Sequence, residues 1–280
     1  AGQYPNVFAY HQSNQGASSA RNFGISKAQG EYVVFLDCDD FLVLDTLETF
    51  HDLAVQWDTP DLLLGSYVQL NHSDHSTPPV EKKKDLSLPS SPVWDSGLDA
   101  FAYLLSTRQH QPMACLKICR LDFLVQNDLY FIPNMICEDE EWSVRAFLCA
   151  NRVAATSHAF YQYEKRGNSI STTFDEQFLT GSIRACYEID SFLSKCDLSL
   201  QHSKLILNWL SKRICRLFAR HKKRGFSKSI LIQTFAIYFA PRNDNLIYCR
   251  KKQLSFRNRF HLWMVTHANN PIVWNLIGHL

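Results

Sequence analysis

Residues 32–40 read Tyr-Val-Val-Phe-Leu-Asp-Cys-Asp-Asp, an apolar run that leads directly into three carboxylates. An unbroken run of β-branched and aromatic residues is typical of a strand buried on both faces in a parallel sheet. In open α/β sheets, ligands bind beyond the carboxyl ends of such strands. We therefore expect residues 32–36 to form a buried strand and the acids that follow it to lie at a ligand site.

The segments on both sides of this stretch alternate between strand and helix patterns. Residues 5–11 are expected to form a short strand, and a helix capped by Ser18 or Ser19 follows it. After the acidic turn we expect a helix over about residues 45–57 and a strand over about residues 61–70. This strand-helix alternation indicates an α/β sheet flanked by helices.

Residues 71–96 interrupt the alternation with four prolines and a charge run, and we interpret them as an exposed loop or a β-excursion. We divide the chain into an α/β domain over residues 1–173 and a helical region over residues 174–280. The later elements expected from periodicity are helices over 98–107, 122–126, 137–150, 175–196, 201–222 and 226–239, and strands over 113–118, 152–157 and 160–164.

Composition excludes several classes of protein. Hydrophobic residues make up 46% and charged residues 20% of the 280 residues, which is incompatible with wholesale disorder. No apolar run approaches the roughly 18 residues that span a bilayer. The nine cysteines are scattered and odd in number, which favours reduced thiols in a cytoplasmic protein over a disulfide framework or a zinc site.

Charge is distributed unevenly along the chain. The net charge is +2, but residues 201–260 contain 15 Lys and Arg and a single acid, Asp244. Within this segment the helix expected over 201–222 is amphipathic, which is compatible with two interpretations. It either lies on an anionic membrane surface, or packs its apolar stripe on the α/β domain and leaves its cations exposed. No known nucleic-acid recognition module is present, so we expect no nucleic-acid partner.

Two neighbouring segments have the residue types of a phosphate and metal site. Asp37 and Asp39 offer oxygen ligands of the kind that Mg²⁺ or Mn²⁺ takes together with substrate phosphates. Residues 16–22 form a Gly-led turn into a helix N-terminus, where free N–H groups and Arg21 can bind phosphate. Each segment alone is equally compatible with a solvated acidic turn or an ordinary capped helix.

Read together, residues 16–40 resemble the core of the family 2 glycosyltransferases, which have the GT-A fold. The matching pattern is a G-x-S-x-A-R-N helix, then G-E-Y, an apolar strand and D-x-D-D. Residues 115–142 resemble the acceptor-side segment of the family, which ends in E-D-x-x-[FW]. Residues 161–171 resemble its Y-x-Y-R-x-R-x-x-S-I-S segment, with Glu164 where Arg is usual. The resemblance covers roughly residues 5–172.

The resemblance implies transfer of a sugar, with inversion, from a nucleoside diphosphate sugar to an acceptor hydroxyl. It implies Mn²⁺ or Mg²⁺ held by Asp39, with Asp37 touching the metal or the ribose. Asp139 is the expected catalytic base, with Glu138 as second choice, and we expect neighbouring acids to raise one another's pKa. The expected donor-binding residues are Gly16, Ser18, Arg21, Asp37 and Arg166.

The family also has N-terminal nucleotide-binding strands and a D-D-G-S-T-D segment, and we expect this chain to lack them. The resemblance and the basic helices suggest a glycan or polyprenyl-linked acceptor, in cell-surface polysaccharide or lipid-linked glycan assembly. We expect a cytoplasmic protein, peripheral at the inner face of the cell membrane. The alternative is a non-catalytic protein that binds membrane or nucleic acid through its basic helical region.

Overall fold

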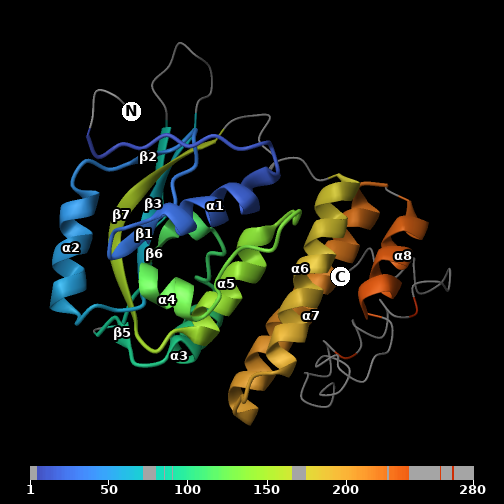
Figure 1. Cartoon of the computed structure of the whole chain (residues 1–280). Helices are drawn as coiled ribbons and strands as arrows, with labels where there is room; N and C mark the ends of the chain where they lie inside the picture. The colour runs from blue at the N-terminus through green and yellow to red at the C-terminus, as the bar shows by residue number, and fades with distance from the viewer. Residues whose placement is uncertain are drawn as a thin grey trace.

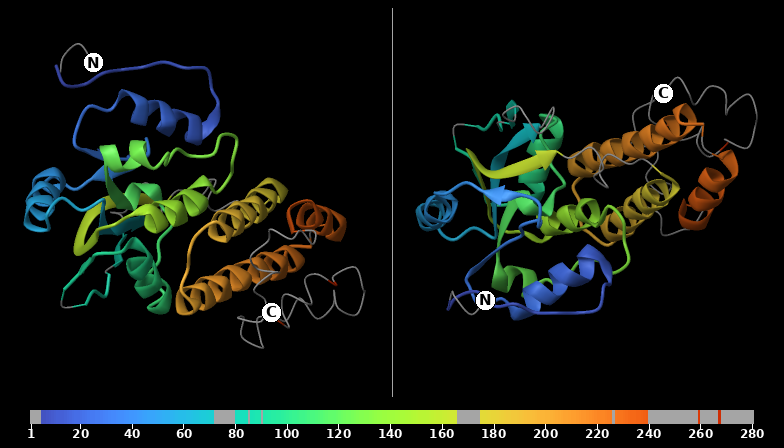
Figure 2. Two further views of the ribbon diagram at one scale, coloured as in Figure 1. Left: turned by 60° about the horizontal axis from the view of Figure 1, so that its bottom comes forward. Right: turned by 90° about the horizontal axis from the view of Figure 1, so that it is seen from above.

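A mixed β-sheet with flanking helices forms one half of the molecule, and three further helices lie beside it (Figure 1). The computed structural model describes residues 5–71, 80–84, 86–89, 91–165, 175–225 and 227–239, together with Arg259 and His267. Figure 2 shows the helix over Thr46–Gln56 and the three C-terminal helices on opposite sides of the sheet. The elements in chain order are α1 (Gly16–Lys27), β1 (Tyr32–Val34), β2 (Phe41–Leu42), α2 (Thr46–Gln56), β3 (Leu62–Asn71), β4 (Val80–Lys84), β5 (Val93–Trp94), α3 (Gly97–Ser106), the 3₁₀ helix η1 (Ala114–Leu116), β6 (Lys117–Arg120), α4 (Leu121–Gln126), α5 (Glu138–Cys149), β7 (Val153–Lys165), α6 (Glu176–Ser194), α7 (Leu200–Lys223) and α8 (Lys228–Phe239).

The sheet has the order β1-β6-β3-β7-β2, with β4 beside β3 and β5 beside β7. Only the β3–β7 pairing is parallel among these strands. In β3, Leu62 and Leu64 pack into one hydrophobic cluster and Leu63 into the other. Because successive side chains of a strand point to opposite faces, this central strand is covered on both sides. The mixed α/β sheet flanked by helices confirms the expected fold class.

The strand expected over residues 32–36 is shorter and differently placed. β1 covers only Tyr32–Val34, is half-buried, and pairs antiparallel with β6. No other described strand pairs with it, so it lies at an edge and is not buried on both faces in a parallel arrangement. The expectation of a parallel, two-sided strand was therefore wrong for the described part of the chain.

Four other strand predictions need correction. Residues 5–11 form no strand in the structure. The expected strand over 113–118 is a 3₁₀ turn followed by β6. The two strands expected over 152–157 and 160–164 are one continuous strand, β7, whose pairing with β3 shifts register near Ser66. Within residues 71–96, β4 and β5 bear out a β-excursion.

The C-terminal helices share a hydrophobic cluster with the sheet half. The apolar stripe of α7 is buried there, through Ile206, Leu210, Ile214, Leu217 and Phe218. This favours the interpretation in which the stripe packs on the rest of the protein. None of the helices in the described part of the chain combines the length and apolarity needed to span a membrane.

Candidate active site

The acidic turn after β1 is fixed to the sheet through its last carboxylate. Asp40 is buried and accepts hydrogen bonds from the Tyr161 hydroxyl at 2.6 Å and from the Glu164 amide at 2.9 Å. Its own amide donates to the Asp37 carbonyl at 3.1 Å and closes the turn. Burial raises the pKa of Asp40, while the Tyr161 bond opposes that shift. Asp40 is thus an anchor between the turn and β7.

The other two acids of the turn remain available at its surface. The Asp37 side chain is 42% exposed and accepts from Arg21 Nη2 at 3.0 Å, while its amide donates to the Tyr161 hydroxyl at 3.3 Å. The Asp39 side chain makes no hydrogen bond or ion pair with another described residue. Of the acids in the turn, Asp39 is therefore the carboxylate left unneutralised.

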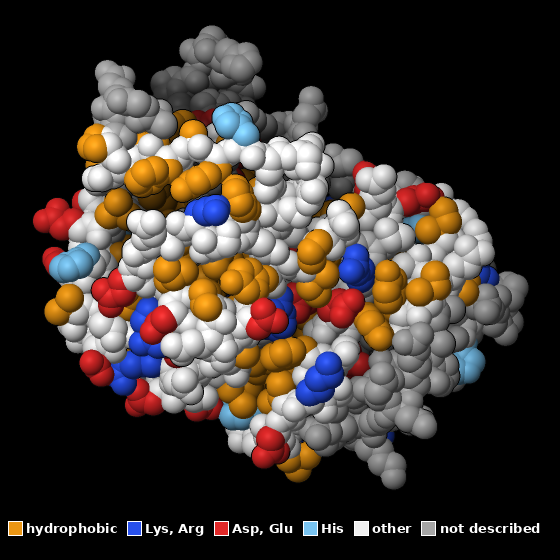
Figure 3. Space-filling view, in the orientation of Figure 1, with side chains coloured by type: hydrophobic (Ala, Val, Ile, Leu, Met, Phe, Trp, Pro, Cys, Tyr) orange, Lys and Arg blue, Asp and Glu red, His pale blue; other side chains and the backbone are white. Residues whose placement is uncertain are grey.

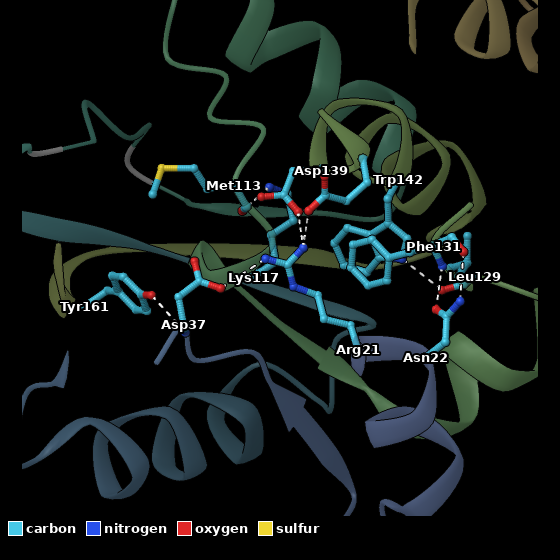
Figure 4. A network of polar contacts seen from close by, with 11 residues as sticks. Arg21, Asn22, Asp37, Met113, Lys117, Leu129, Phe131, Asp139, Trp142 and Tyr161 are labelled. Carbon is cyan, nitrogen blue, oxygen red and sulfur yellow. Dashed lines mark hydrogen bonds and ion pairs between the residues drawn. The ribbon is translucent and has the colours of Figure 1, made fainter. Parts of the chain in front are cut away.

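Arg21 joins the acidic turn to the start of α5 (Figure 4). Its Nη1 atom donates to Glu138 at 2.6 Å and to Asp139 at 3.1 Å, while Nη2 reaches Asp37. Burial alone would lower the pKa of Arg21, but the three carboxylates outweigh burial and raise it. Sequence reasoning placed Arg21 on a donor phosphate. In this structure its guanidinium is shared by the carboxylates.

Asn22, the neighbour of Arg21 on α1, binds the backbone of the segment before α5. Its amide group donates to the Phe131 carbonyl at 2.8 Å and accepts from the Phe131 amide at 2.7 Å. The Phe131 ring stacks on Trp142 of α5 and also lies 5.2 Å from the Arg21 guanidinium carbon. These contacts hold α1 against the segment that leads into α5.

The four acids at the start of α5 pair with three different arginines. Glu138 and Asp139 face Arg21, Glu140 pairs with Arg213 of α7, and Glu141 pairs with Arg145 one turn along α5. Acids at a helix N-terminus also interact favourably with the helix dipole. The expected cluster of mutually repelling acids is therefore largely neutralised by arginines.

Asp139 has the pKa expected of a base that works near neutral pH. Burial is the largest cause that raises its pKa to about 6, Arg21 lowers it, and Glu138 raises it. A backbone hydrogen bond from Ala114 also favours the charged form. The predicted direction was right. The predicted cause, repulsion among neighbouring acids, is secondary to burial.

Two residues that sequence reasoning left without a role lie at this site. Tyr161 bonds both ends of the acidic turn, and Lys117 is buried beneath Asp139 (Figure 4). A lysine inside the apolar run of residues 113–118 was a usable signal, because lysine is rarely buried without a partner. Tyr161 had no comparable signal, because its partners are 121 and 124 residues away.

A groove of about 530 Å³ lies between α1 and β1, and Arg21, Asp37 and Cys38 are among the residues that line it. Its walls are mostly small and apolar, and hydrophobic side chains are prominent over this half of the molecule in Figure 3. Gly16 precedes the groove with φ +82°, and the buried Ser18 hydroxyl has no hydrogen-bond partner among the described residues. Arg166 lies outside the described residues.

The acidic turn is where the sequence predicts a metal ion. Among the described residues, no three His, Cys, Asp or Glu side chains are placed to hold a metal ion together. Mg²⁺ is commonly bound by only one or two carboxylates, with substrate phosphates supplying further oxygens. The unpaired Asp39 carboxylate and the half-exposed Asp37 fit that type of site.

Comparison with known proteins gives a consistent set of relatives. The family model for glycosyl transferase family 2 matches residues 1–96. The chain is 28% identical over 173 residues to the uncharacterized glycosyltransferase YibD of Escherichia coli (strain K12), covering 61% of this chain and 48% of that protein. It is 28% identical over 185 residues to the cholesterol galactosyltransferase of Borreliella burgdorferi, covering 62% and 48%. The chain spans about half the length of these curated relatives.

A solved structure shows the same fold. Staphylococcus aureus TarS residues 1–349, in complex with UDP-GlcNAc, superposes with a TM-score of 0.57 at 20% identity, covering 91% of this chain and 72% of that chain. TarS is a poly(ribitol-phosphate) β-N-acetylglucosaminyltransferase. The likeness establishes a GT-A-like sheet followed by helices. With this fold, the family match over residues 1–96 and the motif residues gathered around Arg21, the chain is similar to the proteins of glycosyltransferase family 2.

Proposed function

We propose that this protein transfers a sugar from a nucleoside diphosphate sugar to an acceptor hydroxyl with inversion, using Asp139 as the general base. The supporting observation is the position of Asp139. It is a carboxylate with a pKa near 6, joined through Arg21 to the acidic turn at the carboxyl end of β1. A base with a pKa close to the working pH combines availability with proton affinity.

The acidic turn is the proposed place of the donor diphosphate. Asp39 is the proposed ligand of Mn²⁺ or Mg²⁺, and Asp37 is proposed to touch the same ion or the ribose. When bound, such an ion neutralises charge on the departing diphosphate. Gly16, Ser18 and Arg166 are proposed to contribute donor contacts.

Arg21 has one proposed role before the donor binds and another once the donor phosphate is present. In the donor-free protein it holds Asp37, Glu138 and Asp139 within hydrogen-bond distance. A donor phosphate can bind Arg21 only if it replaces one of these carboxylates as a hydrogen-bond partner. Asp37 has the most exposed side chain of the three. Release of Asp37 by Arg21 would leave Asp37 free for the metal ion or the ribose.

The acceptor is proposed to be a glycan or a polyprenyl-linked sugar of cell-surface polysaccharide or lipid-linked glycan assembly, and the transferred group to be a hexosyl group. The exposed cations on α7 support a peripheral place at an anionic membrane surface. They are Lys204, Lys212, Arg216, Arg220 and Lys223, and the exposed Arg224 follows the helix directly. Since the apolar stripe of the same helix is buried, that association would be electrostatic.

A donor screen tests the proposal. The protein is mixed with UDP-, GDP- and dTDP-sugars with and without Mn²⁺, and thermal stabilisation and nucleotide release are measured. We expect one donor to stabilise the protein in a metal-dependent way, and Asp39→Ala to abolish that effect. Asp99→Ala, an exposed acid of α3, is the control and should behave as wild type. If none of the donors binds under any condition, the transferase proposal is wrong.

A further inference from the structure

Lys117 occupies a position that is unusual for a lysine. It is the first residue of β6, and only 1% of it is exposed. Its ammonium group donates to the Gln111 carbonyl at 2.8 Å and the Met113 carbonyl at 2.9 Å, and lies 5.9 Å from the centre of the Phe147 ring. A buried ammonium is costly unless it is hydrogen-bonded and balanced by an opposite charge.

The groups around Lys117 leave Asp139 as its counter-charge. Burial raises the pKa of the Cys115 and Cys119 thiols to about 12, so both are neutral at physiological pH. Burial lowers the pKa of His110 well below its ordinary value, so that ring is neutral too. Burial lowers the pKa of Lys117 to about 8, and Asp139 is the carboxylate that opposes this shift. At neutral pH the lysine therefore remains mostly charged, and its charge acts on Asp139.

Lys117 also fixes the backbone that touches Asp139. The two carbonyls that it binds belong to the segment entering η1, and the next residue, Ala114, supplies a backbone hydrogen bond to Asp139. Through this segment the lysine connects β6 to the N-terminus of α5. One side chain thus controls both the local charge and the local geometry at Asp139.

We propose that Lys117 is a positioning residue that holds Asp139 in place and favours its ionised form in the transfer reaction. This inference rests on the proposed role of Asp139 as the base. The charged groups that face Asp139 are Arg21 from α1, Glu138 from its own helix and Lys117 from β6. Removing the charge of Lys117 leaves one cation in place of two, so the carboxylate becomes harder to ionise.

The test compares Lys117→Met, which keeps the volume and removes the charge, with Lys117→Arg, which keeps the charge. Lys195→Met, an exposed lysine at the C-terminal end of α6, is the matched control. For each protein we would measure the thermal midpoint, the donor Kd, and kcat/KM between about pH 5 and pH 8. If Lys117→Met does not fold, Lys117→Gln, which keeps a donor for the two carbonyls, takes its place.

We expect the acid limb of the Lys117→Met profile to move up by about half to one pH unit, since the carboxylate loses a nearby cation. Donor Kd should stay unchanged, and Lys117→Arg and Lys195→Met should keep the wild-type limb. An unmoved limb in Lys117→Met, whatever its rate, would overturn the inference and leave Lys117 a purely structural residue. Failure of the proposed function is recognised separately, because Asp139→Asn would then retain turnover.

Discussion

The ionisation of Asp139 gives the reaction a specific pH dependence. Its pKa is raised to about 6, so the carboxylate form, which accepts a proton, predominates above that pH. We expect kcat/KM to be fully developed near neutral pH and to fall as pH decreases through about 6. The shift also has a stability consequence: the raised folded-state pKa means that ionising Asp139 reduces folding stability as pH rises from about 4 to about 6. A pH–rate profile with donor and acceptor checks the first expectation, and a flat profile through pH 6 would contradict it.

Arg21 should be necessary for both stability and the pKa of Asp139. Arg21→Ala leaves three carboxylates without their shared cation, and we expect a loss of about 2 kcal/mol in the free energy of unfolding. The acid limb of the rate profile should also move to higher pH. Urea denaturation checks the first effect, with Lys27→Ala at the end of the same helix as the control, expected within about 0.5 kcal/mol of wild type. Equal midpoints for Arg21→Ala and wild type would show that the guanidinium is not a structural link.

Sequence reasoning named residues of the candidate site more readily than it named their partners. Asp37, Glu138 and Asp139 were all expected at the site, and the structure brings them to one guanidinium. That Arg21 would contact the acids could not be predicted, because Glu138 and Asp139 lie 117 and 118 residues from it. Spacing along the chain shows which side chains share a face of one helix or strand. It shows little about which charged side chains of different elements come into contact.

At the scale of elements, the crossing of α3 and α5 depends on a glycine. A Cβ atom at Gly97 would lie 2.0 Å from the Phe147 carbonyl oxygen and 2.8 Å from the Ala150 Cβ atom. Gly97→Ala should therefore force the helices apart and destabilise the protein by about 1–3 kcal/mol. At Gly24 in α1 nothing lies within 4 Å, so Gly24→Ala should stabilise by roughly 0.5–1 kcal/mol through helix propensity. Thermal unfolding of both variants checks the pair, and a harmless Gly97→Ala would refute the close packing.

Helices were predicted well and strands poorly, for physical reasons. Helix caps and periodicity are local, and α2, α3 and α5 to α8 begin and end close to the expected residues. Strand identity depends on a partner. Residues 5–11 have the composition of a strand, but they form no strand in the structure. β7 continues through a polar stretch because its pairing with β3 shifts register there.

At the scale of the whole molecule, the basic surface of α7 should bind anionic membranes through charge alone. Since its apolar stripe is buried, we expect binding to phosphatidylglycerol vesicles to weaken steeply with salt, and to be reduced by the double substitution Lys212→Glu and Arg216→Glu. Vesicle co-sedimentation checks this, with phosphatidylcholine vesicles as the control. Binding that persists at high salt would contradict an electrostatic association.

The amphipathic pattern of α7 did not show whether its apolar stripe faces a membrane or the rest of the protein. The fold shows that this stripe packs on the rest of the protein. The cluster shared with α3, α5 and α6 buries Ile206, Leu210, Ile214 and Phe218. Arg213 of the same helix pairs with Glu140 of α5. A helical period predicts that one face is covered without showing what covers it. The same helix that continues the core therefore also neutralises one acid beside the candidate site.

The most direct test of the central claim separates donor binding from turnover in Asp139→Asn. The substitution keeps the shape of the side chain and removes its capacity to accept a proton. We expect the variant to bind the nucleotide sugar with the wild-type Kd and to lose turnover by about 10²-fold or more. Turnover within a few-fold of wild type, at unchanged donor affinity, would show that Asp139 is not the base and that the chemistry of this site lies elsewhere.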